Sequence, residues 1–379
     1  MNQFEIIHRE KRMLGIFGLY SRRDDENGVF FKIRRALIAV FSTVMLICLF
    51  IKMYENRNNL LDIFETCYYF MVQAAFVIKL YIYFYHLPDL HALEEMLSGK
   101  IFNSLSKEQE MYISDAMKSH KIFAGCYQFC CVCCAIIYSI FPAMDGQALA
   151  VPIYSPFNVE KYRMFLYCFE VCCFFMTACN NSSFDGMTVG LTTIMSAQLD
   201  VLKDNLKHAA DRDMGGKFLE QEKKIKDRLR NCVRHHNAIL EFTAKTQDIF
   251  STGVFFQILA SMLGICLTGL QSLMVPWGSV QFASVGLFLV TEIIQIGMFC
   301  WFGENIIIKS SEIELSCYMS EWRSCSTSNK RIFLIIMENA KTPIKFTAKG
   351  LFILSLGTFV MVLRSGYSYF AVLRQVSQK

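Results

Sequence analysis

The side chains with the greatest capacity for chemistry in this sequence are cysteines, a histidine pair and a few ionisable residues within apolar runs. Two cysteine clusters, Cys126 to Cys134 and Cys168 to Cys173, could suggest a metal site or a disulfide framework. A metal site needs separated pairs with histidine or acidic partners at ligand spacing, and neither cluster has them. Both clusters lie inside apolar runs, so we predict that their cysteines are small, polarizable packing residues.

The histidine pair, His235 and His236, does not have the spacing of a metal site either. Adjacent residues on a helix point in different directions, whereas a two-histidine site on one helix uses i, i+4 spacing. We expect both rings to be solvated or near a helix cap. A glycine-rich phosphate loop, a Ser/His/Asp constellation and a carboxylate pair do not stand out. The sequence therefore predicts no enzymatic activity, no cofactor and no metal.

Three ionisable residues within apolar runs need a separate account, because a charge inside a membrane is costly and usually functional. Lys79 lies near the cytoplasmic end of its run, where a lysine can extend its ammonium group to the interface. Glu170 and Glu292 lie deeper. Each either faces an internal site or is hydrogen-bonded to a neighbouring helix, and the sequence leaves both interpretations open.

The elements that must position these residues are membrane-spanning helices. Hydrophobic residues make up 54% of the 379 positions and charged residues 19%, which is too apolar for an ordinary soluble domain. A span requires roughly 20 mostly apolar residues. Runs of this kind lie at 36–51, 60–85, 122–141, 162–179, 249–275, 280–302 and 351–372. The predicted fold class is an all-α membrane protein with seven transmembrane helices.

The distribution of Lys and Arg predicts the orientation of these helices. Segments 1–35, 86–121, 183–245 and 303–349 carry 30 Lys and Arg residues, and the opposite connecting segments carry five. We expect the first set to be cytoplasmic, which places the N-terminus in the cytoplasm and, with seven spans, the C-terminus outside the cell. The net charge of +5 reflects this topology and gives no basis for nucleic-acid binding.

The largest polar segment, 183–245, contains an amphipathic helix with a basic face. Its apolar residues at nearly helical spacing are Leu219, Ile225, Leu229, Val233 and Ile239. Such a helix either packs on its own subunit or binds a partner such as calmodulin or anionic lipid, and we favour packing.

The stretch Gly303 to Val376 closely resembles the carboxyl-terminal signature of insect odorant receptors. The matching features are Tyr318 and Trp322 at Tyr-x3-Trp spacing, an apolar run ending in Pro343, and then Thr347, Ala348, Phe352, Ser355, Leu356, Thr358, Phe359 and Tyr367-Ser-Tyr-Phe370. Elsewhere the resemblance rests on length, seven spans and inverted topology. In general character the chain resembles a ligand-tuned subunit from a dipteran, such as a mosquito.

This resemblance implies an odorant-gated, non-selective cation channel in the plasma membrane, with localisation in the dendrites of olfactory sensory neurons. The implied partners are an odorant co-receptor subunit in a heterotetramer, a small volatile odorant, the lipid bilayer and the conducted cations. The seventh helix is implied to line the pore, with Val372 as a hydrophobic gate and Gln375 as a polar pore-lining residue. A ring of valines can close a narrow pore by dewetting.

The resemblance also implies an odorant pocket in the outer half of the second, third, fourth and sixth spans, with the fifth span alongside. These spans are rich in aromatic and sulfur-containing residues, which suits a small aromatic ligand with one or two polar handles. The candidate ligand-binding residues are Tyr69, Val72, Gln73, Phe76, Cys131, Ala135, Tyr138, Phe169, Cys173, Met176, Ser284, Leu287 and Phe288. The first four share one helical face.

The expected organisation has four parts: a cytoplasmic segment 1–35, six transmembrane helices within 36–302, a cytoplasmic anchor and assembly region 303–350, and a pore helix with a short extracellular tail at 351–379. Two alternatives are a gustatory receptor channel subunit and a metabotropic seven-helix receptor. The first ends its seventh span in a different pattern, resembling T-Y-x5-Q-F, and the second requires an extracellular N-terminus.

Overall fold

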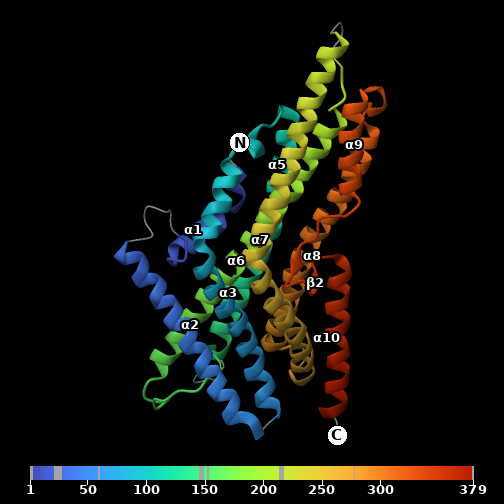
Figure 1. Ribbon diagram of the computed structural model, residues 1–379. Helices are drawn as coiled ribbons and strands as arrows, with labels where there is room; N and C mark the ends of the chain where they lie inside the picture. Colours follow the sequence, from blue (N-terminus) through green and yellow to red (C-terminus); the bar gives the residue numbers. More distant parts are fainter. Residues whose placement is uncertain are drawn as a thin grey trace.

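The computed structural model describes residues 3–20, 28–58, 60–144, 149–151, 153–212, 217–276 and 278–377, which form an elongated bundle of helices (Figure 1). The helices are α1 (His8–Ile16), α2 (Val29–Glu55), α3 (Leu60–Ser98), α4 (Lys100–Asn103), α5 (Lys107–Met144), α6 (Arg163–Lys207), α7 (Phe218–Met274), α8 (Val280–Met319), α9 (Thr327–Ala340) and α10 (Leu356–Ser377). Short 3-10 helices lie at Gln3–Ile7, Asn56–Asn58 and Trp322–Ser324, and two short strands are β1 (Thr347–Ala348) and β2 (Phe352–Ile353).

Six helices are long and apolar enough to cross a membrane, namely α2, α3, α5, α6, α7 and α8. They match the first six predicted runs to within one residue at the ends of those runs, so the chain has the helical architecture of a membrane protein. The seventh predicted run, at 351–372, falls on β2 and α10 and is not among these six within the described part of the chain. The seventh span therefore stays a prediction.

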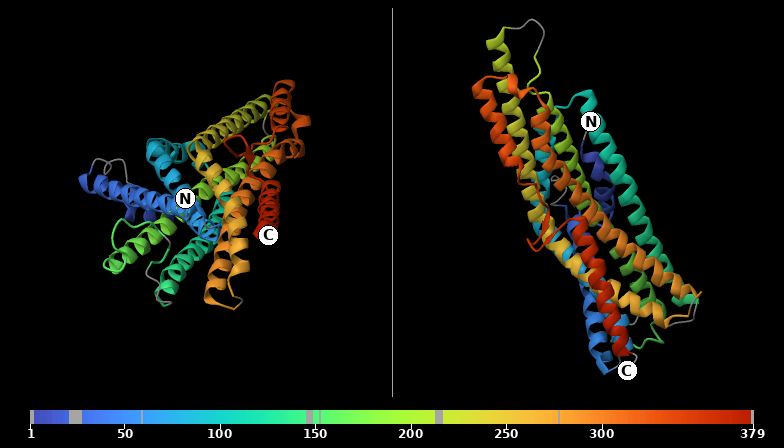
Figure 2. Two further views of the ribbon diagram at one scale, coloured as in Figure 1. Left: turned by 90° about the horizontal axis from the view of Figure 1, so that it is seen from below. Right: turned by 90° about the vertical axis from the view of Figure 1, so that its right-hand side faces the viewer.

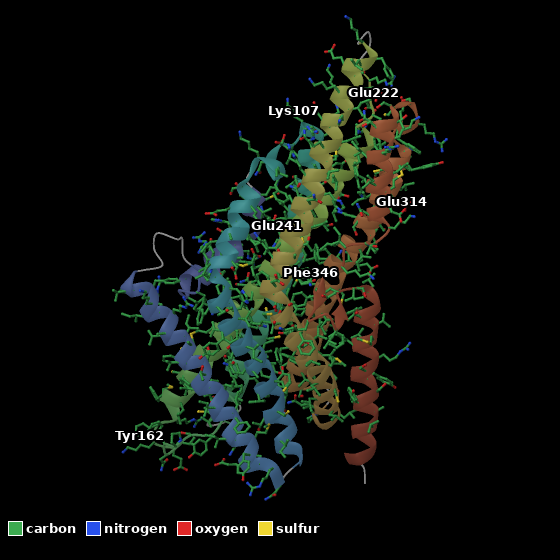
Figure 3. The ribbon with its side chains drawn as sticks, viewed as in Figure 1. Lys107, Tyr162, Glu222, Glu241, Glu314 and Phe346 are labelled. Carbon is green, nitrogen blue, oxygen red and sulfur yellow. The ribbon has the colours of Figure 1, made fainter. Side chains whose placement is uncertain are left out.

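Several helices continue well beyond their apolar runs at one end of the bundle. In Figure 3, Lys107, Glu222, Glu241 and Glu314 lie toward this end, and Tyr162 lies at the opposite end. Ion pairs join neighbouring helices there, including one of 2.6 Å between Lys203 on α6 and Glu312 on α8. Because these charges gather at one end, the two ends of the bundle are chemically different.

The polar extension of α7 packs against the rest of the subunit. Ile225 and Leu229 are fully buried, as the amphipathic pattern predicts, whereas Leu219 is 83% exposed. His235 was expected to be solvated or near a cap, and that expectation is wrong. Its ring is buried against α6, and its Nε2 lies 2.8 Å from Oε1 of Gln198. Burial, together with the neighbouring His236, lowers the pKa of His235 to about 4.

The α6 helix also extends further than the sequence indicated. The predicted fourth run ends at residue 179, but α6 continues to Lys207, and almost every side chain from Ser182 to Leu199 is buried. This segment is the centre of the bundle rather than the start of a polar loop. Glycine permits close approach of the N-terminal segment, because a Cβ at Gly190 would collide with Ile7.

A small hairpin precedes the last helix. Strands β1 and β2 pair antiparallel, with Thr347 opposite Ile353, and the turn between them places Lys349 and Gly350 at φ values of 52° and 69°. The apolar residues near 351 therefore form a strand, and α10 begins at Leu356 rather than at 351. The α10 helix then runs along α7 and α8 at the side of the bundle (Figure 2).

Candidate ligand cavity and pore helix

A cavity of about 110 Å³ lies inside the bundle between α3, α5, α6 and α8, with α2 and α7 completing its wall. Its lining is mostly apolar and aromatic, with polar groups on one side: Met45, Leu49, Tyr68, Tyr69, Val72, Gln73, Tyr127, Cys131, Cys134, Ala135, Tyr138, Phe174, Thr177, Ala178, Asn181, Gln257, Phe288, Thr291, Glu292 and Gln295. Small-molecule sites usually combine an apolar wall with a few polar groups. An engineered apolar cavity of roughly 150 Å³ holds benzene, so this cavity is somewhat smaller than a single-ring ligand needs.

The aromatic part of the lining is built from edge-to-face ring contacts. The ring centroids of Tyr68 and Phe288 lie 4.5 Å apart at an angle of 81°, and Tyr69 meets Tyr138 at 6.0 Å and 88°. Such contacts hold rings in fixed orientations and contribute about 0.5–1.5 kcal/mol each beyond area burial. The cavity therefore has stiff walls on this side.

A buried network of polar side chains forms the opposite side of the cavity. The Lys79 ammonium lies 2.5 Å from Oδ1 of Asp185 and donates to Oε1 of Gln257 at 2.6 Å. Asp185 also accepts from Tyr127 at 3.0 Å and from Gln295 at 2.5 Å. A buried ion pair needs such additional hydrogen bonds to compensate its lost hydration.

The network connects Lys79 to the wall of the cavity. The amide nitrogen of Gln257 donates to Gln295 at 2.8 Å and to Ser261 at 3.3 Å. The Ser261 hydroxyl in turn lies 2.5 Å from Oε2 of Glu292. Glu292 thus meets both interpretations left open by the sequence, because it lines the cavity and is hydrogen-bonded to a neighbouring helix.

The connection between α5 and α6 covers the aromatic end of the cavity. Val151 and Ile153 are buried in a cluster with Tyr68 and Tyr69. The carboxylate of Glu170 accepts hydrogen bonds from the backbone amides of residues 150 and 151, at 2.6 and 3.4 Å. Glu170 is therefore hydrogen-bonded to this segment and does not face the cavity.

Seven of the predicted ligand-binding residues line the cavity, namely Tyr69, Val72, Gln73, Cys131, Ala135, Tyr138 and Phe288. They come from three helices that are distant in the sequence, so the helix-by-helix matching brings together one site. Their role in ligand binding stays a prediction.

Six predicted residues lie elsewhere: Phe76, Phe169, Cys173, Met176, Ser284 and Leu287. Phe76 is fully buried about one turn beyond Gln73 on α3, and the centroids of its ring and the Phe184 ring lie 6.4 Å apart. On α6 the cavity is lined by residues such as Phe174 and Thr177. On α6 the predicted residues are therefore offset by about one residue from those that line the cavity, which turns a side chain by about 100° around a helix.

The expectation that Lys79 reaches the membrane interface is wrong. Its side chain is only 6% exposed, and its ammonium group bonds to Asp185, Gln257 and Asn181. The expectation failed because Asp185 and Asn181 lie on the continuation of α6, beyond the predicted end of the fourth run. The cavity-lining polar residues that the prediction missed, Gln257 and Gln295 among them, were detectable as polar positions inside apolar runs.

The predicted gate residue lies on the exposed side of α10. The Val372 side chain is 58% exposed and borders an apolar crevice of about 600 Å³ between α3, α7 and α10. Gln375 is on the same helix, but its side chain falls outside the described part of the structure.

Two glycines bring α10 close to α7. A Cβ at Gly366 would lie 2.9 Å from Cγ2 of Ile265, and a Cβ at Gly269 would lie 3.0 Å from the Phe370 ring. At its other end, α10 begins where the backbone amide of Leu356 donates to Glu304 at 2.9 Å. An acidic acceptor at a helix N-terminus stabilises that end, so α10 is attached to both α7 and α8.

Comparisons with known proteins agree on one family. A family model described as "7tm Odorant receptor" matches residues 59–367. The chain is 23% identical to Odorant receptor Or1 of Anopheles gambiae over 350 residues, covering 86% of this chain and 84% of that protein. It is 22% identical to Odorant receptor 46a, isoform B, of Drosophila melanogaster over 376 residues, covering 97% and 96%.

The fold is also similar to that of a solved receptor. The structure of the insect olfactory receptor OR5 from Machilis hrabei in complex with eugenol matches with a TM-score of 0.88 and 15% identity, covering 99% of this chain and 100% of that chain. A second structure of OR5 from Machilis hrabei matches with a TM-score of 0.87 and 15% identity, covering 98% of both chains.

Proposed function

The chain belongs to the insect odorant receptor family, a family of receptors rather than enzymes, and we propose that it is the odorant-sensing subunit of a ligand-gated, non-selective cation channel. The observation that carries this proposal is the cavity lined by Tyr69, Tyr138 and Phe288 on three helices. OR5 from Machilis hrabei, which has the same fold, was solved with eugenol bound. A small volatile, most simply an aromatic one, is the ligand that this lining would accept.

The size of the cavity suggests how binding opens the channel. At about 110 Å³ it is smaller than the roughly 150 Å³ cavity known to hold benzene, so a ring-sized ligand must move the lining helices apart. A ligand shifts an equilibrium only through its differential affinity for the two states. An odorant that binds the expanded state 100-fold more tightly would shift the equilibrium toward it by about 2.7 kcal/mol.

Movement of α7 offers a route from the cavity to the gate. Gln257 lines the cavity, and roughly two to three turns further along the same helix Ile265 and Gly269 contact α10. A displacement of α7 at Gln257 would therefore be transmitted to Phe370 and to the nearby Val372. We propose that a ring of Val372 side chains closes the pore by dewetting and that rotation of α10 admits cations.

The proposal includes the topology and the assembly. We place the end of the bundle that holds Lys107 and Glu222 in the cytoplasm, since the connecting segments at this end are rich in Lys and Arg. The N-terminus is then cytoplasmic, the C-terminus is extracellular, and segment 303–350 is the cytoplasmic assembly region. The partner is an odorant co-receptor subunit in a heterotetramer, in the plasma membrane of olfactory sensory neuron dendrites.

Expression in oocytes with and without an insect odorant co-receptor tests this function. We expect volatile-evoked cation currents only when both subunits are present, and currents that require a G protein would contradict the proposal. An epitope at the C-terminus should be labelled on intact cells, and labelling only after permeabilisation would overturn the topology.

The gate is tested by Val372→Ala, which should raise the current in the absence of odorant because a smaller side chain wets the closed pore more easily. Val360→Ala is the matched control, since Val360 is a similarly exposed valine on α10, 54% against 58%, three turns away. Equal effects of the two substitutions, or no effect of either, would contradict the assignment.

A further inference from the structure

The direction of hydrogen bonding in the polar network is fixed by its first member. A lysine ammonium group can only donate, so the group of Gln257 that lies 2.6 Å from Lys79 Nζ must be the amide oxygen. The amide nitrogen of Gln257 then points away from Lys79 and donates to Ser261 and Gln295. Each later bond in the series inherits this direction.

The series ends on an acceptor at the wall of the cavity. Because Ser261 accepts from Gln257, its own hydrogen is directed to Oε2 of Glu292, 2.5 Å away. Glu292 is 7% exposed and lines the cavity. A carboxyl group keeps further acceptor lone pairs beside this bond, so Glu292 retains acceptor capacity toward the ligand.

Most neighbouring donors on the polar side of the cavity are already committed within the protein. Thr291 donates to the Leu287 carbonyl at 2.8 Å, and Thr177 donates to Gln73 at 3.0 Å. Tyr127 and Gln295 both donate to Asp185. The polar side of the cavity is therefore biased toward accepting hydrogen bonds from a ligand rather than donating them.

Glu292 is also correctly spaced from the aromatic wall. Phe288 precedes it by four residues on α8, so the two side chains lie on one helical face about 5–6 Å apart at Cβ. An aromatic ring packed against Phe288 can thus place a substituent within hydrogen-bonding distance of the carboxylate. This spacing suits a single ring that carries one hydroxyl group.

We propose that Glu292 selects ligands that donate a hydrogen bond, so that the preferred odorants are small hydroxyl compounds, above all phenols and aromatic alcohols, rather than the corresponding ethers. The inference rests on the proposed odorant-sensing function and concerns only the ranking of compounds in the cavity. An ether leaves this buried acceptor without a donor, which costs enough affinity to separate such pairs by about tenfold or more.

The test uses matched volatiles that differ by one methyl group on oxygen. Phenol is compared with anisole, and benzyl alcohol with benzyl methyl ether, in oocytes that express this chain with an odorant co-receptor. We expect the hydroxyl compound of each pair to have an EC50 at least about tenfold lower than its ether. An equal or lower EC50 for the ether overturns the inference, as does a channel that other volatiles open but neither hydroxyl compound does.

Three variants connect this ranking to Glu292. Glu292→Gln, whose amide both donates and accepts, should reduce the potency ratio to about twofold or less, whereas Glu292→Asp should retain the preference for the hydroxyl compound. Glu314→Gln is the matched control, because it makes the same change at an exposed position on α8 outside the cavity lining, and it should leave the ratio unchanged. Surface biotinylation shows that each variant reaches the membrane.

The outcomes separate this inference from the function on which it rests. A wild-type ratio in Glu292→Gln, or an equal loss of the ratio in Glu314→Gln, overturns the role of Glu292 while odorant-gated currents remain. A chain that reaches the surface with the co-receptor and gives no current with any volatile overturns the channel proposal and this inference together. Ether-preferring currents would indicate instead that Asn181, which also lines the cavity, donates to the ligand.

Discussion

Replacing Lys79 with methionine should destabilise the bundle strongly, because it leaves the buried Asp185 carboxylate without its cation. The Lys79 ammonium lies 2.5 Å from Asp185 and also donates to Gln257 and Asn181, at 2.6 and 2.9 Å. After the substitution Asp185 retains only its hydrogen bonds from Tyr127 and Gln295. Breaking one partner of a buried ion pair typically costs about 3–5 kcal/mol.

The double variant Lys79→Met with Asp185→Leu separates the cost of an unpaired charge from the value of the pair. Replacing both partners of a buried ion pair by apolar residues is often neutral or stabilising. We therefore expect the double variant to be more stable than Lys79→Met alone, with a coupling energy of about 2 kcal/mol or more.

The assay is thermal unfolding of the detergent-solubilised protein, followed by fluorescence-detected size-exclusion chromatography. Lys203→Met is the matched control, because Lys203 forms its ion pairs in the polar extensions of α6 and α8, with partly exposed partners. Partly exposed pairs contribute at most about 1 kcal/mol. Equal melting temperatures for Lys79→Met and Lys203→Met would refute the reasoning. So would a double variant whose loss of stability equals the sum of the losses in Lys79→Met alone and Asp185→Leu alone.

Two further predictions concern packing and pH. Gly303→Ala should destabilise the protein by about 1–3 kcal/mol, because a Cβ there would collide with Leu354. The control Gly286→Ala, also on α8, places its Cβ in open space and should be neutral. Similar melting temperatures for the two variants would contradict this prediction. His235 has a pKa of about 4 in the folded protein against about 6.5 when unfolded, so its neutral form favours folding at pH 7. That contribution, up to about 3 kcal/mol, is lost as the pH falls from about 6.5 toward 4, because the unfolded chain then binds the proton first. His235→Gln should reduce the loss of thermal stability between pH 7 and pH 4.5, and an unchanged pH dependence would rule out His235 as its source.

The positions of the long helices could be predicted from the sequence alone. A run of roughly 20 apolar residues must be helical in a bilayer because its backbone groups have no water to bind. This local rule located α2, α3, α5, α6, α7 and α8. The carboxyl-terminal motif around Tyr318 and Trp322 resembles odorant receptors, and the family model that matches residues 59–367 confirms that family.

Helix ends and side-chain partners depended on the tertiary structure. The α6 helix passes 28 residues beyond the predicted end of its run, from 179 to Lys207, because its polar side chains find partners inside the bundle. Asp185 appears in the sequence as the start of a loop, yet it pairs with Lys79, which is 106 positions away. Pairing over such a separation depends on how helices pack, and no local pattern records it.

The set of cavity-lining residues likewise depends partly on the sequence and partly on the tertiary structure. Periodicity placed Tyr69, Val72 and Gln73 on one face of α3, and the structure brings that face to the cavity. On α6 the same reasoning selected Cys173 where Phe174 lines the cavity. The sequence determines which residues share a helical face, because that follows from 3.6 residues per turn. Only the packed bundle determines which face points inward, because the rotation of each helix is set by contacts with all of its neighbours.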